Sequence, residues 1–283
     1  MVVSLPHFIA KEKGFYKEEG LEIEDAVIKT SNQMSQDLIG GHIDASIHLA
    51  LVPLLKQMEK APNSAKIFSI SAMDAANHFD GVLVKSNSTI TKLEELSGKK
   101  VGVFPGTTAK NSFADVFKRK FPNLPLPIFV ELDPPLHIQS LERGDVDGLF
   151  AYEPTLTLGI IKNNFREIFR SIYVEQYTPN PIGIGAVNAK WLNDNPKTAA
   201  AFFRTMDKAV VFMNQHPDEA RQILSRATNL DMNVAQVMHI LPMSLSTEIN
   251  YENLNGYFSV LKTLGEITTV PNAEDVCIKP IIK

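Results

Sequence analysis

Cysteine is almost absent from this sequence, which has Cys277 as the single cysteine among its 283 residues. One thiol cannot close an internal disulfide, and no pair of cysteines or cysteine–histidine cluster is available to hold zinc. We therefore predict no disulfide and no metal site. We interpret Cys277 as a small buried or edge residue.

The sequence also lacks a long apolar run and an excess of either charge. No run reaches the roughly 18 apolar residues that are needed to span a bilayer. The formal net charge is −4, so nothing favours nucleic acid or an anionic membrane as a partner. The short basic cluster Lys118–Lys120 is typical of a solvated helix face.

No export signal is visible at the start of the chain, because residues 1–6 have neither a basic segment nor a long apolar segment. Two explanations stay open: a cytosolic protein, or a leader that lies outside this sequence. The chain starts abruptly in a run that we predict to be a strand, and this start favours the second explanation.

The length of the chain is sufficient for about two domains. Over its first half, short β-branched or alternating runs are separated by amphipathic stretches of roughly 10–15 residues. This alternation predicts an α/β fold with mixed, mostly parallel sheets covered by helices. The predicted strands are Val2–Leu5, Leu21–Glu24, Asp44–Leu49, Lys66–Ala72, Val82–Lys85, Val101–Phe104, Pro127–Glu131 and Gly148–Tyr152.

The residue pattern changes after Pro196, where runs typical of strands become rare. We predict that this C-terminal region is helical and packs on the first lobe. The predicted helices are Lys197–Asn214, Asp218–Ala227, Met232–Leu241 and Glu252–Leu264.

An internal repeat predicts two homologous lobes. Residues 38–45 and 141–148 share the form Leu-x-x-Gly-x-(Ile/Val)-Asp-(Ala/Gly), and upstream of each copy Val2–Pro6 echoes Val101–Pro105. The alternative is that the two segments resemble each other by chance, because both are a helix that ends at a glycine and is followed by a strand. We place lobe one at 1–81 and 184–283, and lobe two at 82–183.

The two lobes are expected to face each other across a cleft, with a ligand at the carboxyl ends of the strands. These strand ends and the loop between the lobes supply the candidate binding residues. They are Ser4, Leu5, Phe8, His48 and Leu49 in lobe one, and Asp74, His78, Gly106, Thr107, Thr108, Tyr152 and Glu153 on the inter-lobe loop and lobe two.

Three of these candidates have chemistry that suits a polar solute. Thr107 and Thr108 open a predicted helix, where free N–H groups and hydroxyls bind polar groups, although ordinary helix capping explains a threonine equally well. Glu153 suits a cationic group, or is a surface-loop carboxylate. The aromatic residues Phe8, Phe104 and Tyr152 suit the walls around a planar solute, or belong to the core.

No catalytic constellation is visible in the sequence. It has no Gly-x-Ser-x-Gly elbow, no His-Glu-x-x-His motif and no Gly-x-Gly-x-x-Gly loop. We therefore predict no catalytic residue, no cofactor and no enzymatic activity, although catalysis by carboxylates requires no motif.

Residues 6–24, with the run Phe-Ile-Ala-Lys-Glu-Lys-Gly-Phe-Tyr-Lys-Glu-Glu-Gly-Leu, resemble the opening of the nitrate, sulfonate, taurine and thiamine-precursor family of ABC-transporter binding proteins. Further matches follow in the same order along almost the whole chain. They are Gly41–Ala45, Leu93–Val103, Pro105–Thr108, Glu153-Pro154 and the helical stretch 214–220.

This resemblance implies a two-lobed type 2 periplasmic-binding-protein fold that closes over one small solute and delivers it to a membrane ABC permease. It also implies a monomer in the cell envelope, periplasmic or lipid-anchored, and no nucleic-acid partner. Family members that bind nitrate or sulfonates often place Trp, Arg or Lys around the anion, whereas Trp191 lies outside the predicted cleft. We therefore favour an organic solute with a polar or cationic ring, such as a thiamine pyrimidine precursor.

The alternative is an enzyme on the same fold, because relatives act in the thiamine-pyrimidine and menaquinone pathways. The former carry a cysteine-rich motif, which a chain with a single cysteine lacks.

Overall fold

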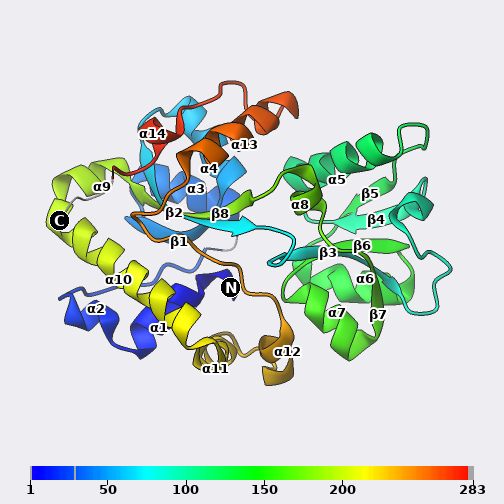
Figure 1. Cartoon of the computed structure of the whole chain (residues 1–283), viewed down its shortest axis with the longest axis horizontal. Coiled ribbons are helices and arrows are strands. Elements are labelled where there is room, and N and C mark those ends of the chain that lie inside the picture. Colours follow the sequence, from blue (N-terminus) through cyan, green and yellow to red (C-terminus); the bar gives the residue numbers. More distant parts are fainter. Residues whose placement is uncertain (1, 29, 280–283) are drawn as a thin grey trace. The chain divides into compact units, whose positions relative to one another are not determined.

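The computed structural model describes residues 2–28 and 30–279, which form two compact α/β units (Figure 1). Unit 1 contains Met1–Ala72, Pro181–Met232 and Pro242–Lys283. Unit 2 contains Met73–Asn180 and Asn233–Leu241.

The borders of the units differ from the predicted lobes, which were placed at 1–81 with 184–283 and at 82–183. Residues 73–81 lie in unit 2 because strand β3 (Asp80–Lys85) pairs there with β6 (Gly148–Tyr152). Residues 233–241 also lie in unit 2, and nothing in the local sequence pattern separates them from the helical tail around them.

Unit 1 contains a three-stranded sheet with the order β1–β8–β2. The strands are β1 (Ala45–Ala50), β2 (Ala65–Met73) and β8 (Asn180–Asn188). β1 and β8 are antiparallel, with Ala45 opposite Val187 and Ala50 opposite Gly183. The sheet joins segments that are far apart in the chain.

The central strand β8 carries glycine where neighbouring side chains approach its backbone most closely. A Cβ atom on Gly183 would lie 2.2 Å from His48 Cε1, and one on Gly185 would lie 2.4 Å from Ser69 Oγ and 2.6 Å from Phe68 Cζ. These two positions therefore require glycine for packing.

The helices of unit 1 include the N-terminal pair and most of the C-terminal tail. Helix α10, drawn in yellow-green, packs along α1 and α2 (Figure 1). An ion pair between Glu19 and Arg204 joins the end of α2 to α10, and one between Glu12 and Arg226 joins α1 to α11, each 2.6 Å long. The helices are α1 (Leu5–Glu12), α2 (Phe15–Glu18), α3 (Ser31–Gly40), α4 (Leu51–Lys60), α9 (Ala189–Asp194), α10 (Pro196–Gln215), α11 (Pro217–Thr228), α13 (Tyr251–Thr263) and α14 (Ala273–Val276).

The strand predictions at the N-terminus are wrong. Residues 2–4 form a 3-10 turn and α1 begins at Leu5, because Pro6 is compatible with the first turn of a helix and Leu5 and Ile9 are buried on one face. Leu21–Glu24 is irregular: Ile23 is exposed, and the alternating run pairs with no strand of the described chain. Neither of the two predicted strands at this end exists among the described residues, and Val2–Pro6 therefore does not repeat the strand structure of Val101–Pro105.

Unit 2 contains a five-stranded sheet with the order β5–β4–β6–β3–β7. β4 is parallel to β5 and β6, whereas β3 is antiparallel to both β6 and β7. The predicted α/β class with mixed sheets is confirmed, whereas the prediction of mostly parallel pairing is wrong, because β1–β8, β3–β6 and β3–β7 are antiparallel while β4–β5 and β4–β6 are parallel. The remaining strands are β4 (Lys100–Val103), β5 (Ile128–Glu131) and β7 (Phe165–Phe169).

Helices of unit 2 cover this sheet with buried apolar side chains. One core cluster joins Leu83 and Leu149 on the sheet to Leu141 and Leu156 on two helices. The covering helices are α5 (Thr107–Lys120), α6 (His137–Arg143), α7 (Thr155–Asn163) and α8 (Ile172–Gln176). A further helix, α12 (Met232–Val237), begins in unit 1 and continues into unit 2. The predicted helix Met232–Leu241 therefore ends earlier, at Val237.

The glycine–aspartate repeat has the same structure in both copies. Gly41 and Gly144 end α3 and α6 in the left-handed conformation, with φ of 74° and 81°. A strand follows each of them, β1 or β6. Glycine is needed at these positions because a side chain would strain the backbone there.

Candidate functional site

The sheet of unit 2 brings several predicted site residues to one edge. The carboxyl ends of the parallel strands β4, β5 and β6 lie there, together with the amino end of the antiparallel β3. Asp80 at the start of β3 is the partner of Tyr152 at the end of β6. The loops 104–108, 74–79 and 152–154 therefore start or end at this edge, which we call the unit-2 edge.

Aromatic rings at the unit-2 edge are held in fixed positions. Phe104 stacks on Tyr152, with ring centroids 4.0 Å apart and an angle of 10° between the planes. His137 meets Phe104 edge-on at 4.7 Å, and the Tyr152 hydroxyl lies 2.7 Å from that of Tyr173. These contacts make Tyr152 part of a rigid aromatic wall.

The start of α5 presents hydroxyls and backbone N–H groups. Gly106 is the N-cap, with a φ of 103°, and Thr107 and Thr108 are the first residues of the helix. Thr107 is exposed and Thr108 is half-buried. The Gly106 N–H donates a hydrogen bond of 3.2 Å to Glu131 Oε2, so a carboxylate of the protein already lies at this helix start.

Glu153 is buried, with 5% of its surface exposed. Its carboxylate accepts hydrogen bonds from Thr157 Oγ1 at 2.8 Å, from the Thr157 N–H at 3.2 Å and from the His239 N–H at 3.3 Å. The carboxylate therefore holds the first turn of α7 and the segment that contains His239. It is not the surface-loop carboxylate that was the alternative prediction.

The loop before β3 positions two further predicted residues. Asp74 Oδ1 accepts bonds from the N–H groups of Ala76 and Asn77, which closes a turn and lowers the pKa of Asp74. His78 is buried, and its ring lies 4.0 Å from that of His239 between centroids. Burial, with the nearby His239 and Arg170, lowers the pKa of His78 to about 4.

Sequence reasoning missed two carboxyl groups at the unit-2 edge. Asp80 is fully buried and accepts bonds from Ser171 Oγ at 2.6 Å and the Ile172 N–H at 2.8 Å. Glu167 Oε1 lies over Gly81, buried without a hydrogen-bond partner among the described residues. Desolvation raises the pKa of each to about 7. The sequence signal that could have identified Asp80 is an acidic residue at the start of the apolar run of β3.

The predicted residues of unit 1 lie on two neighbouring parts of the chain, because the turn at residues 2–4, which leads into α1, contacts β1. Leu5 and Leu49 have fully buried side chains, while Ser4 precedes α1 and Phe8 is half-buried on it. His48 is at the end of β1, where its ring covers Gly183. Its Nδ1 atom is buried and has no hydrogen-bond partner within the described chain, and desolvation lowers the pKa of His48 to about 4.

A polar cluster beside Phe8 was not predicted. His7 Nδ1 lies 2.8 Å from the Tyr16 hydroxyl, and its Nε2 lies 3.1 Å from Asp25 Oδ1, while Lys11 also pairs with Asp25, at 2.5 Å. Desolvation lowers the pKa of His7 despite Asp25. No spacing rule pointed to this cluster, because Asp25 comes from an irregular segment.

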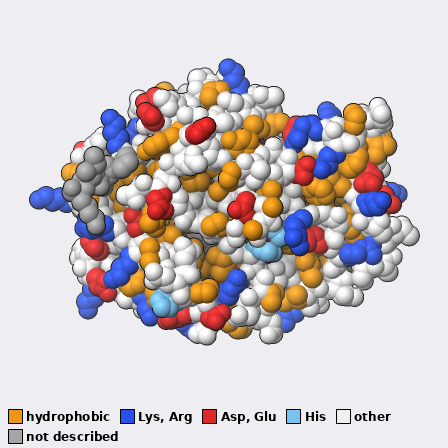
Figure 2. All heavy atoms as spheres, in the orientation of Figure 1, with side chains coloured by type: hydrophobic (Ala, Val, Ile, Leu, Met, Phe, Trp, Pro, Cys, Tyr) orange, Lys and Arg blue, Asp and Glu red, His pale blue; other side chains and the backbone are white. Residues whose placement is uncertain are grey.

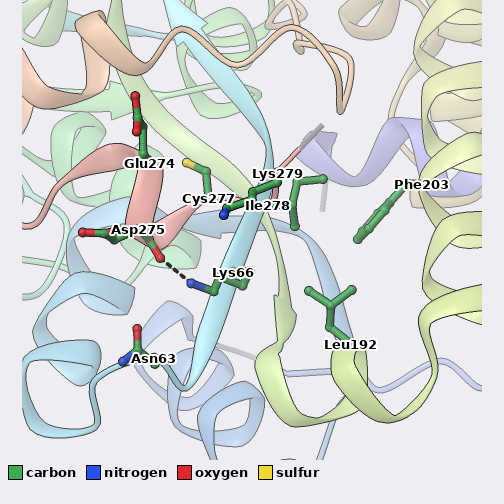
Figure 3. A pocket seen from close by; sticks show the side chains of 9 residues that line it. All are labelled: Asn63, Lys66, Leu192, Phe203, Glu274, Asp275, Cys277, Ile278 and Lys279. Atoms are coloured by element: carbon green, nitrogen blue, oxygen red, sulfur yellow. Dashed lines mark hydrogen bonds between the residues drawn. The ribbon is translucent and has the colours of Figure 1, made fainter. Parts of the chain in front are cut away.

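A hollow of about 600 Å³ lies elsewhere in unit 1 and includes none of the predicted site residues (Figure 3). Lys66, at its wall, donates a hydrogen bond to the Asp275 carbonyl. Its lining comes from the start of β2, from two helices and from the region around Cys277. The lining residues are Asn63, Lys66, Leu192, Phe203, Glu274, Asp275, Cys277, Ile278 and Lys279.

Two further features of the described chain bear on the class of site. Within residues 2–28 and 30–279, no group of three or more His, Cys, Asp or Glu side chains is arranged to hold a metal ion. None of the helices in these ranges combines the length and the apolar character required to cross a bilayer. On the face drawn in Figure 2, basic and acidic side chains are interspersed.

The model of the family described as "NMT1/THI5 like" matches residues 2–220. The chain belongs to this family. The resemblance found in the sequence to the binding proteins for sulfonates, nitrate and related solutes is thereby confirmed.

Individual relatives show the same relationship. The "Putative aliphatic sulfonates-binding protein" of Bacillus subtilis (strain 168) is 25% identical over 236 residues, which cover 82% of this chain and 69% of that protein. The periplasmic aliphatic sulphonate binding protein SsuA from Escherichia coli has a TM-score of 0.79 at 15% identity, over 99% of this chain and 90% of the other.

A third similar structure is that of an enzyme. The desulfurization enzyme DSZB has a TM-score of 0.71 at 13% identity, over 99% of this chain and 94% of the other. The predicted periplasmic-binding-protein fold is confirmed by these structures. Because the fold carries both binding proteins and an enzyme, the fold alone does not decide the activity.

Proposed function

We propose that this protein is the solute-binding component of an ABC-type importer, which captures one small solute by closure of its two units and delivers it to a membrane permease. Membership of the family and the curated sulfonate-binding relative support this proposal. The observation that carries it is the unit-2 edge, where an aromatic wall, the start of α5 and a buried carboxylate adjoin. The protein would act in the cell envelope as a monomer.

The charges at the unit-2 edge favour a neutral or cationic organic solute within the range of the family. An anion at the first N–H groups of α5 would be stabilised by the helix dipole. Here Glu131 already accepts the Gly106 N–H, so a second negative charge would be repelled. An aminopyrimidine-like ring, with N–H donors and a planar face, fits the carboxylates and the wall of Phe104 and Tyr152.

A thermal-shift screen followed by recovery of the ligand tests both parts of this proposal. The panel contains nitrate, taurine, an alkanesulfonate and aminopyrimidines. A binder at 100 times its Kd raises stability by about 2.7 kcal/mol. An aminopyrimidine that is recovered unchanged is the expected result. A sulfonate hit alone would contradict the solute class, and a hit that is chemically altered would show an enzyme.

Replacing Thr108 with valine is expected to weaken solute binding by about 2- to 10-fold, because one hydroxyl hydrogen bond is lost. The melting temperature should stay unchanged, since Thr108 is half-buried and valine has a similar shape. Titration calorimetry measures the affinity. The control is Thr263→Val, an exposed position on α13, and equal affinities of both variants would exclude Thr108 from the site.

Replacing Glu153 with glutamine is expected to weaken the binding of a cationic solute by about 10- to 100-fold, the range for a hydrogen bond to a charged group. A neutral solute should lose less. The matched control is Glu142→Gln, an exposed carboxylate of unit 2 that accepts a bond from Asn163. If Glu153→Gln binds the cationic solute as tightly as the control does, Glu153 acts on the fold alone.

A further inference from the structure

One segment of unit 2 is separated from the rest of that unit in the sequence. Residues 233–241, which we call the strap, are preceded by Met232 and followed by Pro242, both of unit 1. Val234, Ala235 and Met238 of the strap are buried. The strap thus packs on unit 2 through a small apolar face.

His239 ties the strap to the unit-2 edge by two contacts. Its backbone N–H donates to Glu153 Oε1 at 3.3 Å, and its ring lies 4.0 Å from the His78 ring, at an angle of 44°. Only 3% of the surface of His78 is exposed, and its Nδ1 atom has no hydrogen-bond partner among the residues that the structure describes. A proton added to His78 would therefore create a buried donor without an acceptor.

The charges around this histidine pair are mixed. Arg170, which follows β7, repels a proton on His78. Glu153 accepts a hydrogen bond from the His239 backbone N–H. Glu167 on β7 interacts electrostatically with Glu153, and Asp80 on β3 interacts electrostatically with Glu167. Two adjacent imidazoles repel each other when both are charged. Burial, His239 and Arg170 all act in the same direction on His78 and lower its pKa to about 4.

We propose that the contact between His78 and His239 is an acid-sensitive latch, which holds the strap on unit 2 while both rings are neutral and releases it when a proton is bound. The geometry of the strap carries this proposal, because its ring contact and its backbone bond to Glu153 both end at His239. The proposal does not depend on which solute the protein binds.

The direction and size of the effect follow from linkage. A histidine freed from the latch has an ordinary pKa near 6.5, whereas the docked His78 has a pKa of about 4. The released form therefore binds the proton first as the pH falls. The docking equilibrium weakens by up to about tenfold per pH unit from 6.5 downward, and by about 150-fold at pH 4.

Release of the strap is distinct from acid unfolding of unit 2. Asp80 has a pKa of about 7 in the folded unit, above its ordinary value, so protonation of Asp80 stabilises the sheet as the pH falls. The strap and the sheet are thus expected to respond to acid in opposite directions.

A spin label on the strap tests the latch without solute. Val237 is 58% exposed on α12, so Val237→Cys is expected to accept a nitroxide without disturbing the fold. The natural Cys277 is buried, and burial raises its pKa to about 12, which protects it from the label. The ratio of mobile to immobile spectrum, measured from pH 7.5 to 4.5, should rise by up to about tenfold per unit below 6.5.

The histidines are then removed from the labelled protein. The double variant His78→Phe/His239→Phe should show a flat profile, and His42→Phe, an exposed histidine of unit 1, should behave as the parent does. If the double variant does not fold by circular dichroism, His78→Gln and His239→Gln replace it. A flat profile in the parent protein, or acid release that persists without the pair, would overturn the proposal.

Discussion

Asp80→Ala will destabilise unit 2 by about 3–5 kcal/mol at neutral pH. The fully buried Asp80 carboxyl accepts bonds from Ser171 Oγ and the Ile172 N–H, and its removal leaves these donors buried without partners. Hydrogen exchange of β3 and β6 in urea measures the loss, because exchange reports on unit 2 separately from unit 1.

Asp74 provides the matched control for this substitution, since it also lies in the loop before β3 and also accepts backbone bonds. Asp74→Ala should cost less than about 1 kcal/mol, because water replaces the lost acceptor in a turn that is partly exposed. Equal losses in the two variants would contradict a special role of Asp80.

The same carboxyl makes the stability of unit 2 depend on pH. Its folded pKa of about 7 lies above its ordinary value of 3.8, so the native unit binds the proton more tightly than the unfolded chain does. The stability that Asp80 contributes is fully present below pH 3.8 and is lost as the pH rises through 7. Asp80→Asn should flatten this slope in part, since Glu167 has a similarly raised pKa.

Phe113→Ala will destabilise unit 2 by about 3–5 kcal/mol, the usual cost of deleting a buried phenyl ring. Phe113 is fully buried on α5 and contacts three rings. These are Phe117 on the same helix at 6.3 Å, Phe129 on β5 at 5.5 Å and Phe150 on β6 at 5.7 Å. The ring therefore fixes α5, with Thr108 at its start, to the sheet.

Unfolding in urea measures this loss, and Phe113→Leu is the control. Leucine fills more of the space than alanine does, so its cost should be less than half that of alanine. The alanine variant should also bind solute more weakly than Thr108→Val does, because the whole start of α5 is released. A loss of stability below about 1 kcal/mol in the alanine variant would show that the neighbouring rings move to fill the cavity.

Local signals were sufficient to predict most of unit 2. Strand β6 follows Gly144, whose left-handed conformation ends α6, and the apolar runs of β3 and β4 are short and bounded by turn residues. The errors at the N-terminus arise because a strand requires a partner. Leu21–Glu24 alternates as strands do, yet no strand in the described part of the chain pairs with it.

The rule that ligands bind at the carboxyl ends of strands was sufficient to name part of the candidate site. Thr108 follows β4, Tyr152 is the last residue of β6 and Glu153 follows it, so these residues could be named from that rule alone. Asp80 joins them because β3 runs antiparallel to β6, and His239 joins them because residues 233–241 return to unit 2. Both facts concern pairing over long distances in the chain, about which a local pattern carries no information.

The two sheets differ in when their strands leave the ribosome. All five strands of the unit-2 sheet lie between Asp80 and Phe169, so this sheet can assemble on the growing chain. In unit 1, Ala45 pairs with Val187, and β8 separates β1 from β2. Until β8 has been synthesised, the apolar side chains of β1 and β2 lack their central partner. During translation these two strands are therefore the segments most in need of a chaperone, even though they come first.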